Sequence, residues 1–478
     1  MTTFASAEVA TGFGMECDGP GRTGGLTSPA EAARLVSAEF FAEQRGAAVD
    51  GAGDAGTGGG SPAAADEIRS LTSLTDTPET VGTSDESTAI EVGKSAESYL
   101  EECFVTEVSV LSREKFNTLL QLSRRDFTIT RHLGRGSFSD VFEVSVGITG
   151  SSTPKAAVLR TRNRRASLAS SVTAPVMAGK NQKKLAMKCL RPQIRSDSEL
   201  FISGAEDLVH ETALLASLDH PNIIKLHARA SGSLRDSFIL DDGYFILLDR
   251  LAGTLTDRLK EWQCVPERLT GPGRDELHVA RSVADAVAYL HSKRIVFRDL
   301  KPDNVGFDSS GTWKLFDFGF AVGLPEKNED NPSGLLTDRS GTPRYMAPEV
   351  GLNSDTLTIG YGRPVDVYSF GVLLWQLCSK QRPFGTIHTA DEFESKVFVG
   401  GHRPDIDSRW PTPVKNIIEK CWQQRPKKRP AIKDVGAALH AILSEEPVQK
   451  AHVVEECVPG VRKKGCRRIT TSSVSFMG

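Results

Sequence analysis

Two short segments of this chain bring together the residue types that phosphoryl transfer requires. The first is Phe297-Arg298-Asp299-Leu300-Lys301-Pro302-Asp303-Asn304, and the second, shortly after it, is Asp317-Phe318-Gly319. Moving a phosphoryl group from a magnesium-bound nucleotide to a hydroxyl asks little covalent chemistry of a protein. It needs an oriented acceptor, and it needs positive charge around a highly anionic donor. Together the two segments contain carboxylates, an amide and an ammonium that could meet both needs.

Each of these side chains suits one part of that reaction. Asp299 can accept the hydroxyl proton and aim the attacking oxygen. Lys301 can reach the transferring phosphate. Asn304 and Asp317 offer oxygen ligands of the kind that Mg²⁺ prefers. Because Asp299, Lys301 and Asn304 fall in so short a stretch, we do not interpret them as ordinary loop residues.

A glycine-rich segment upstream could hold the phosphates. Gly134-Arg135-Gly136-Ser137-Phe138-Ser139 lies between two strand-like runs, at residues 127–133 and 141–146. Glycines let the backbone approach phosphate oxygens, and backbone N–H groups supply neutral donors. Many hairpin turns contain the same pattern, so this segment alone is a weak signal.

A lysine and a glutamate further along could form an ion pair. Leu185-Ala186-Met187-Lys188 is a short apolar run that ends in lysine, and such a lysine is usually a solvated edge residue. Residues 207–218 have leucines at helical spacing, and Glu211 lies among them. We therefore choose Glu211, rather than Glu206, as the carboxylate partner of Lys188.

In this order the motifs resemble those of the eukaryotic protein kinases, over about residues 125–443. Residues 297–304 resemble the family's catalytic loop, residues 317–319 its metal loop, and Gly341–Glu349 the segment that closes its activation loop. Asp366 resembles the aspartate that anchors the catalytic loop, and Arg429 the arginine that pairs with Glu349. The resemblance implies an α+β, bilobal fold, with a small β-rich N-lobe, a larger helical C-lobe and disordered tails at both ends.

The resemblance also implies a set of site residues, with ATP and Mg²⁺ as cofactors. The catalytic residues would be Asp299, Lys301, Asn304, Lys188 and Glu211. ATP would lie against Leu133, Gly134, Arg135, Gly136, Ser137, Phe138, Ser139, Asp140, Val141, Ala186, Lys188, Asp249 and Leu251. In the family, the positions of Leu133 and Val141 clamp the adenine, and backbone groups near Asp249 and Leu251 bind its edge. Mg²⁺ would be held by Asn304 and Asp317.

Two positions depart from the family pattern. Phe297 stands where the family usually has histidine, and Ser139 where it has a third glycine. The histidine contributes mainly to an apolar stack under the metal-loop phenylalanine, and Phe297 can keep that stacking while a hydrogen bond is lost. Since Lys188, Asp299 and the metal ligands are all present, we expect an active enzyme.

The acceptor and the regulation follow from neighbouring residues. Lys301 and Thr342 resemble the serine/threonine-directed pattern, and the surrounding segments resemble the tyrosine-kinase-like group. In the family, the arginine at the position of Arg298 meets a phosphate on the activation loop, which implies an upstream activating kinase. The alternative is that Arg298 bonds only to local backbone. The candidate phosphate acceptors are Ser333, Thr337 and Ser340.

The rest of the chain divides by composition. Residues 1–95 are acidic and rich in Gly, Ala, Ser and Thr, so we expect them to be disordered, with either a transient or a docking helix at Ser28–Gln44. Residues 96–124 read as a linker, 125–443 as the kinase domain and 444–478 as a basic tail. A basic insertion at 150–184 reads as a solvated loop, and Ser167 within it lies in a sequence suited to basic-directed kinases. Chance explains that sequence equally well.

Composition also limits the partners and the compartment. The eight cysteines are scattered without paired spacing, which favours free thiols in a reducing compartment. No signal peptide and no membrane span are evident, so we expect a cytosolic or nuclear protein. The basic segments lack interleaved aromatics, and we do not expect nucleic acid binding. The sequence does not indicate the oligomeric state.

Two functions are consistent with this reading. The first is an ATP-dependent kinase that phosphorylates Ser/Thr hydroxyls of protein substrates. The second is a pseudokinase scaffold, which would use the fold, the acidic tail and the basic insertion only to bind partners.

Overall fold

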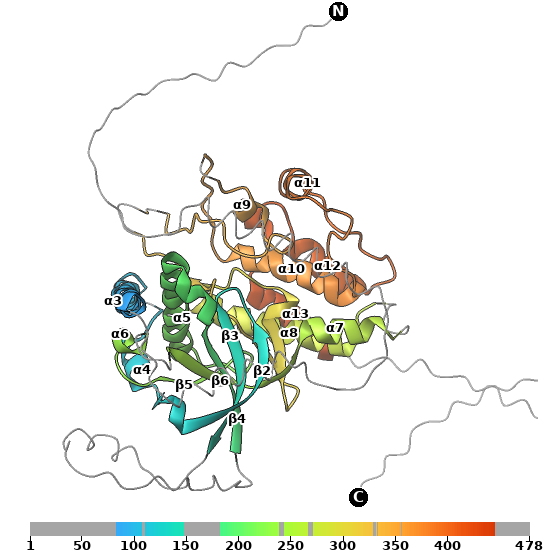
Figure 1. The fold of residues 1–478 in the computed structure, drawn as a ribbon. Coiled ribbons are helices and arrows are strands. Elements are labelled where there is room, and N and C mark those ends of the chain that lie inside the picture. The colour runs from blue at the N-terminus through green and yellow to red at the C-terminus, as the bar shows by residue number, and fades with distance from the viewer. Residues whose placement is uncertain are drawn as a thin grey trace, which may run out of the picture.

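The computed structural model describes residues 83–107, 110–147, 182–238, 243–265, 271–327, 331, 333–354 and 356–444. Predictions for the chain before residue 83, for most of the basic insertion with Ser167, and for the C-terminal tail lie outside these residues. Figure 1 shows the described chain as two parts, a sheet with a few helices and a larger bundle of helices. The predicted α+β, bilobal architecture is confirmed.

The N-lobe is built on one six-stranded sheet with the order β1-β5-β6-β4-β3-β2. Its strands are β1 (Gln121–Leu122), β2 (Phe127–Arg135), β3 (Ser139–Gly147), β4 (Gln182–Leu190), β5 (Leu226–Ala230) and β6 (Phe245–Asp249). The pairs are antiparallel except for β1 with β5. Every residue of β6 from Phe245 to Leu248 is buried, as a central strand covered on both faces requires.

Helix α5 (Ser198–Ser217) covers the predicted segment at 207–218 except for its last residue, and it packs against the sheet. The Asp197 carboxylate caps it by accepting hydrogen bonds from the N–H groups of Glu199 and Leu200. Within the sheet, Val141 of β3 lies opposite Lys188 of β4. The glycine-rich hairpin and the predicted phosphate-binding lysine are therefore neighbours.

The C-lobe consists mainly of helices. They are α7 (Leu255–Gln263), α8 (Arg274–Ser292), α9 (Pro348–Gly351), α10 (Pro364–Ser379), α11 (Ala390–Phe393), α12 (Thr412–Cys421) and α13 (Ile432–Ser444). Short strands support the loops between them, namely β7 (Leu251–Thr254), β8 (Ile295–Val296), β9 (Val305–Asp308), β10 (Trp313–Leu315) and β11 (Val322–Gly323). Helix α8 is buried along one side, and α10 is buried along nearly its whole length, so both belong to the core of the C-lobe.

The predicted boundary at residue 95 is wrong. Helix α3 (Thr83–Thr106) crosses it, and the short helices α4 (Arg113–Thr118) and α6 (Leu234–Ser237) lie nearby in Figure 1. One side of α3 is buried at helical spacing, at Ala89, Val92, Ala96, Leu100, Cys103 and Phe104. The part predicted as a linker also folds onto the N-lobe, because β1 joins the sheet. An average over residues 1–95 concealed this apolar side of α3.

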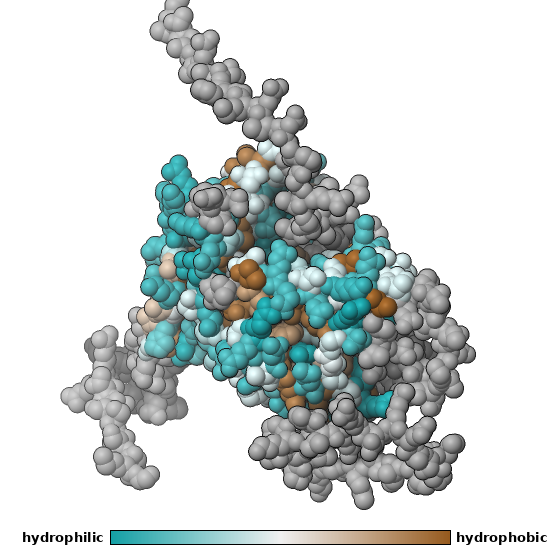
Figure 2. All heavy atoms as spheres, turned by 90° about the vertical axis from the view of Figure 1, so that its left-hand side faces the viewer, coloured by the Kyte–Doolittle hydropathy of each residue, from teal (hydrophilic) through white to brown (hydrophobic). Residues whose placement is uncertain are grey.

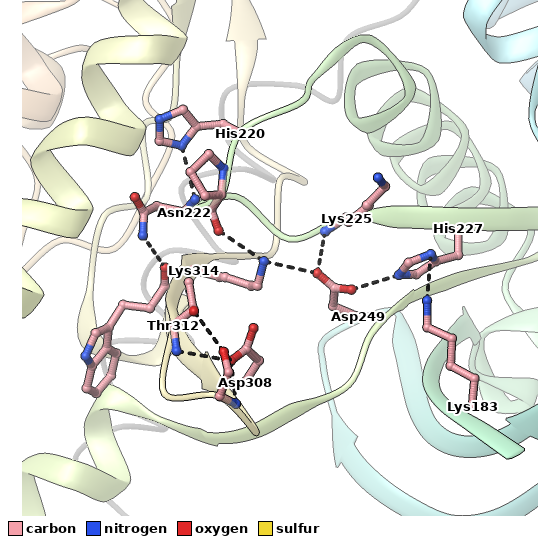
Figure 3. A network of polar contacts seen from close by, with 12 residues as sticks. Lys183, His220, Asn222, Lys225, His227, Asp249, Asp308, Thr312 and Lys314 are labelled. Carbon is pink, nitrogen blue, oxygen red and sulfur yellow. Dashed lines mark hydrogen bonds and ion pairs between the residues drawn. The ribbon is translucent and has the colours of Figure 1, made fainter. Parts of the chain in front are cut away.

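The junction between the lobes carries a polar network centred on Asp249, the last residue of β6. Figure 3 shows its carboxylate between His227 of β5 and Lys314 of β10, with the Lys225 N–H also donating to it. The His227 Nε2–Oδ1 distance is 2.8 Å and the Lys314 Nζ–Oδ2 distance is 3.3 Å. Beside it, Arg250 donates to Glu143 of β3 at 2.9 Å. The side chains of Asp249 and Arg250 therefore connect the end of β6 to neighbouring strands.

We predict that Asp249 makes stability depend on acid pH. Burial alone would raise the pKa of this carboxyl, but the hydrogen bonds from His227 and the Lys225 N–H, with the charge of Lys314, lower it to about 2. A depressed folded-state pKa contributes stability above the unfolded value near 3.8, and that stability is lost as pH falls towards 2. Urea unfolding of wild type and Asp249→Asn should show a constant difference in free energy above about pH 5 and a shrinking one below about pH 4. An equal difference at all these pH values would contradict the assignment.

The described residues contain five cysteines, Cys103, Cys189, Cys264, Cys378 and Cys421, and all five are free thiols. This agrees with the prediction for that part of the chain. Among the helices of the described residues, none is long and apolar enough to cross a membrane.

Candidate active site

The predicted ion pair between β4 and α5 is present. Lys188 Nζ lies 2.7 Å from Glu211 Oε2 and 2.9 Å from Asp317 Oδ1. The second oxygen of Glu211 accepts a hydrogen bond from the Phe318 N–H at 3.1 Å. Glu211 thus connects the phosphate-binding lysine to the backbone of the metal loop, residues 317–319, and Glu206 is not the partner.

The charges in this group stabilise one another. Burial disfavours the charged form of Lys188, but the carboxylates of Asp317 and Glu211 outweigh it and raise the pKa of the ammonium above its usual range. The charge of Lys188 in turn lowers the pKa of Asp317. Lys188 therefore stays cationic and Asp317 anionic at neutral pH, as binding of phosphates and a divalent cation requires.

In the catalytic loop, residues 297–304, four donors surround the buried Asp299 carboxylate. Oδ1 accepts from the Thr342 N–H at 2.9 Å and from the Thr342 hydroxyl at 2.6 Å. Oδ2 accepts from Asn304 Nδ2 at 2.7 Å and from Lys301 Nζ at 3.0 Å. Lys301 also donates to the Thr342 hydroxyl at 2.7 Å. The structure thus brings Asp299, Lys301 and Asn304 together, and it adds Thr342 to them.

The backbone of this loop is held in a strained shape by a buried carboxylate. Arg298 has a φ of 68°, in the left-handed region that residues other than glycine rarely adopt, and Asp317 of the metal loop has a φ of 60° in the same region. Asp366 of α10 accepts from the N–H groups of Phe297 at 2.9 Å and Arg298 at 2.8 Å, and from His291 Nε2 at 2.8 Å. The anchoring role that the resemblance implied for Asp366 is confirmed.

The substitution at Phe297 leaves the expected apolar stack in place. The rings of Phe297 and Phe318 meet edge to face, with centroids 5.1 Å apart, and both side chains are buried. Such a pair contributes favourably beyond the burial of area alone. Phe297 therefore packs under the metal loop as predicted from the sequence.

The predicted ATP-binding residues lie on neighbouring strands. Leu133 to Arg135 end β2, Ser139 to Val141 begin β3, and the Gly136 N–H closes the turn between them by donating to the Ser139 carbonyl at 2.7 Å. Ala186 and Lys188 lie on β4 beside β3, and Leu251 begins β7. Two side chains of this set face each other, since Arg135 donates to the buried Asp140 at 2.9 Å. Their part in binding ATP stays a prediction.

Sequence reasoning missed one residue at this turn. Arg191, just after β4, donates to the carbonyl of Ser137 at 3.0 Å and to that of Gly136 at 3.4 Å. Its own N–H donates to the Phe138 carbonyl at 2.9 Å. The glycine-rich turn is therefore supported from β4, which no local pattern indicated.

The donor set fits a magnesium ion. Asn304 uses its amide nitrogen on Asp299, so its oxygen, the atom that could bind a metal, takes no part in that bond. Asp317 has a side chain that is 51% exposed and therefore accessible. Two oxygen ligands, supplemented by phosphate oxygens and water, are typical of protein Mg²⁺ sites.

Arg298 binds the carboxylate of Asp338, where the resemblance implied a phosphate on the activation loop. Its Nη1 lies 2.5 Å from Asp338 Oδ2 and 3.3 Å from the Tyr361 hydroxyl, which in turn donates to Asp338 Oδ1 at 2.8 Å. Its Nε donates to the Phe320 carbonyl, in keeping with the alternative of backbone bonding. Burial disfavours the charge of Arg298, but Asp338 and Tyr361 raise its pKa above the usual range. Asp338 thus supplies an anion where the family receives a phosphate.

We predict that Asp338→Ala lowers kcat about tenfold, because it leaves a guanidinium that is only 12% exposed without its carboxylate. Asp338→Asn keeps the shape and removes the charge, so it should fall between wild type and alanine. Phosphorylation of Ser333, Thr337 or Ser340 stays a prediction, under which the triple alanine variant loses activity. Steady-state kinetics on all three variants decide whether Arg298 depends on Asp338 or on a phosphate at one of these acceptors. Wild-type turnover in the triple variant would leave Asp338 as the anion on which Arg298 depends.

The far end of the activation loop is fixed as predicted. Arg429 and Glu349 form a two-pronged ion pair, with Nη1–Oε1 at 2.6 Å and Nη2–Oε2 at 2.8 Å. The Arg429 side chain is fully buried. This pair attaches residues 341–349 to the body of the C-lobe.

Comparison with known proteins agrees with this geometry. Residues 169–439 match the protein kinase domain family, and this chain belongs to that family. The match begins after β2 and β3, but both strands belong to the same sheet as β4. The folded unit therefore extends further towards the N-terminus than the matched segment.

Several curated proteins are similar to part of the chain. A probable serine/threonine-protein kinase of Dictyostelium discoideum is 30% identical over 241 residues, which cover 50% of this chain and 16% of that protein. The dual specificity protein kinase shkC of the same organism is 31% identical over 197 residues, 38% of this chain and 37% of that protein. Mitogen-activated protein kinase kinase kinase 7 of Drosophila melanogaster is 26% identical over 260 residues, 53% of this chain and 35% of that protein. The chain spans well under half the length of each of these relatives.

Proposed function

We propose that this protein is an ATP- and Mg²⁺-dependent serine/threonine protein kinase. One observation carries the proposal: the Lys188–Glu211 ion pair, the metal-loop Asp317 and the buried Asp299 with its four donors are assembled together in one fold. Similarity to proteins named as serine/threonine and dual specificity kinases supports it.

Each side chain has one task in the proposed reaction. Asp299 orients the acceptor hydroxyl and takes its proton. Lys188, held by Glu211, binds the non-transferred phosphates, and Lys301 faces the transferring one. Asn304 and Asp317 would hold Mg²⁺, which would neutralise charge on the phosphates when bound.

Specificity for serine and threonine rests on Lys301 and Thr342. In the structure the ammonium of Lys301 bridges Asp299 and the Thr342 hydroxyl, so these groups form one connected unit beside the proton acceptor. Both residues match the serine/threonine-directed pattern in the sequence. Membership of the tyrosine-kinase-like group is proposed from the sequence segments alone.

The protein substrates, an upstream activating kinase and a cytosolic or nuclear location are part of the same proposal. The five free thiols among the described residues support a reducing compartment. Nucleic acid is not proposed as a partner.

Incubation with labelled Mg-ATP and a generic basic protein tests the activity, with Asp299→Asn as the control. Transfer by wild type and its loss in the control are expected. Equal labelling by both would leave the pseudokinase scaffold as the better description. The described residues give no support to that alternative, because every predicted catalytic side chain is present and in contact with its partner.

A further inference from the structure

Helix α3 lies along α5, the helix that carries Glu211. Figure 1 shows α3 beside α5 and above α6, although α3 is far from both of them in sequence. Ser95 donates to Glu206 of α5 at 2.7 Å, and the buried side of α3 faces the N-lobe. Figure 2 shows this face of the molecule, where the described residues are mainly hydrophilic, in keeping with burial of the apolar side of α3.

The packing of α3 depends on a glycine. A Cβ atom at Gly93 would lie 2.5 Å from the Arg235 carbonyl oxygen of α6, closer than real Cβ contacts come. The backbones of α3 and α6 therefore approach each other more closely than any other residue would allow. Since glycine in mid-helix reduces helix stability, this contact indicates a chain adapted to dock α3 at this place.

Glu107, the residue after α3, reaches two elements of the active site. Its Oε1 lies 3.0 Å from His210 Nε2, and His210 directly precedes Glu211 in α5. Its Oε2 accepts a hydrogen bond from the N–H of Gly323 at 2.8 Å. Gly323 belongs to β11, which follows the metal loop and pairs with β8 just before the catalytic loop. One carboxylate therefore joins α5 to the strand that leaves the metal loop.

The residue at position 323 is also adapted to this contact. A Cβ atom there would lie 2.7 Å from Glu107 Oε2 and 3.0 Å from Val110 Cγ2, so a larger residue would push the carboxylate away from the Gly323 N–H. The bond is well shielded, since the Glu107 side chain is 13% exposed and that of His210 is 7% exposed. A shielded hydrogen bond is costly to leave unmade, which makes the contact strong enough to bias the position of α5.

Cys103, Glu107 and His210 also have the side-chain types and closeness of a metal site. Each of them already has a protein partner. Tyr99 and Cys103 are hydrogen-bonded, His210 bonds to Glu107, and Glu107 bonds to Gly323. Burial raises the pKa of the Cys103 thiol to about 12, which keeps it protonated. We therefore interpret the group as a hydrogen-bonded connection.

We propose that Glu107 is a positioning residue for phosphoryl transfer. Through it, α3 holds α5 and β11 in the arrangement in which Glu211 bonds to both Lys188 and the Phe318 N–H. Glu107 precedes β2, with which the predicted kinase domain begins, and it also lies outside the matched segment at 169–439. The proposal rests on the kinase function proposed above.

The test compares Glu107→Ala, Glu107→Gln and Glu102→Ala in the full chain. Alanine removes both contacts, and we expect kcat/KM for Mg-ATP to fall roughly tenfold. Glutamine can keep both contacts, because its oxygen accepts from the Gly323 N–H and its NH₂ group can donate to His210 Nε2 in the tautomer that carries the ring proton on Nδ1. It should therefore restore most of the activity. Glu102 is an exposed glutamate of the same helix, and its replacement should leave activity unchanged.

A double-mutant cycle with Gly323→Ala measures the coupling between positions 107 and 323 in their effect on activity. General destabilisation does not produce such coupling. The added methyl group should reduce activity more in wild type than in Glu107→Ala, because it strikes the carboxylate that the second variant lacks. Strict additivity, or a glutamine variant as impaired as alanine with an equal loss in Tm, would overturn the proposal.

Backbone hydrogen exchange in α5 and β11 separates this proposal from the kinase function. We expect faster exchange at both elements in Glu107→Ala. If wild type transferred no phosphate but the variant still exchanged faster, the kinase function would fail, while the role of Glu107 in holding α5 and β11 in place would stand. Unchanged exchange and unchanged kinetics in Glu107→Ala, beside an active wild type, would overturn the positioning role alone.

Discussion

Replacing Asp299 with asparagine should reduce kcat by about 10²–10⁴-fold, the usual contribution of a general base. The carboxylate is buried and accepts four hydrogen bonds, two of them from Thr342 and the others from Asn304 and Lys301. Asparagine has nearly the same shape, but its NH₂ group cannot accept a proton from the substrate hydroxyl. Since Asp299 acts on the acceptor, the KM for ATP should change little.

The neighbouring Asp303 offers a matched control. It is an exposed aspartate of the same loop whose carboxylate accepts from the Thr256 hydroxyl at 2.9 Å. Asp303→Asn makes the same chemical change outside the reacting groups, so steady-state kinetics should show less than about a twofold effect, as for most surface substitutions. Comparable losses in both variants would mean that Asp299 supports the loop and does not act on the hydroxyl.

The catalytic loop could be predicted because its functional residues are close in sequence. Asp299, Lys301 and Asn304 lie within one short segment, and a turn of that length places them together whatever surrounds it. The Lys188–Glu211 pair joins a strand to a helix, and it was found because one apolar run ended in lysine and one helical segment held a suitable glutamate. In both cases, local pattern was sufficient to select the residue.

The contacts that the sequence did not predict join distant segments through ordinary residues. Asp338 is one of several acidic residues in an exposed loop, and nothing in its neighbours indicates that it meets Arg298. Glu107 follows helix α3, whose apolar residues are hidden in the average composition by the Gly- and Ser-rich chain before it. The partners of Glu107 lie in α5 and β11. Such contacts are set by tertiary packing, which leaves no periodic signal around either residue.

The Arg429–Glu349 pair is expected to have the largest effect on stability. Arg429 is fully buried, and besides its two bonds to Glu349 it donates to the carbonyls of Gln423 at 2.8 Å and Pro364 at 3.0 Å. Removing one member of a buried pair leaves the other charge uncompensated, at a cost of about 3–5 kcal/mol. We therefore expect Arg429→Ala to lower the free energy of unfolding by about that amount in urea titrations.

Two further variants distinguish the charge from the geometry. Arg429→Lys keeps the charge but cannot donate two parallel bonds to Glu349, so its loss should be smaller than that of alanine but still measurable. The double replacement Arg429→Met with Glu349→Leu leaves no unpaired charge, and it should be more stable than Arg429→Ala. Because Glu349 ends the segment that contains Thr342, activity should fall together with stability in Arg429→Ala. A double variant less stable than Arg429→Ala would show that the carbonyl contacts, and not the ion pair, hold this segment in place.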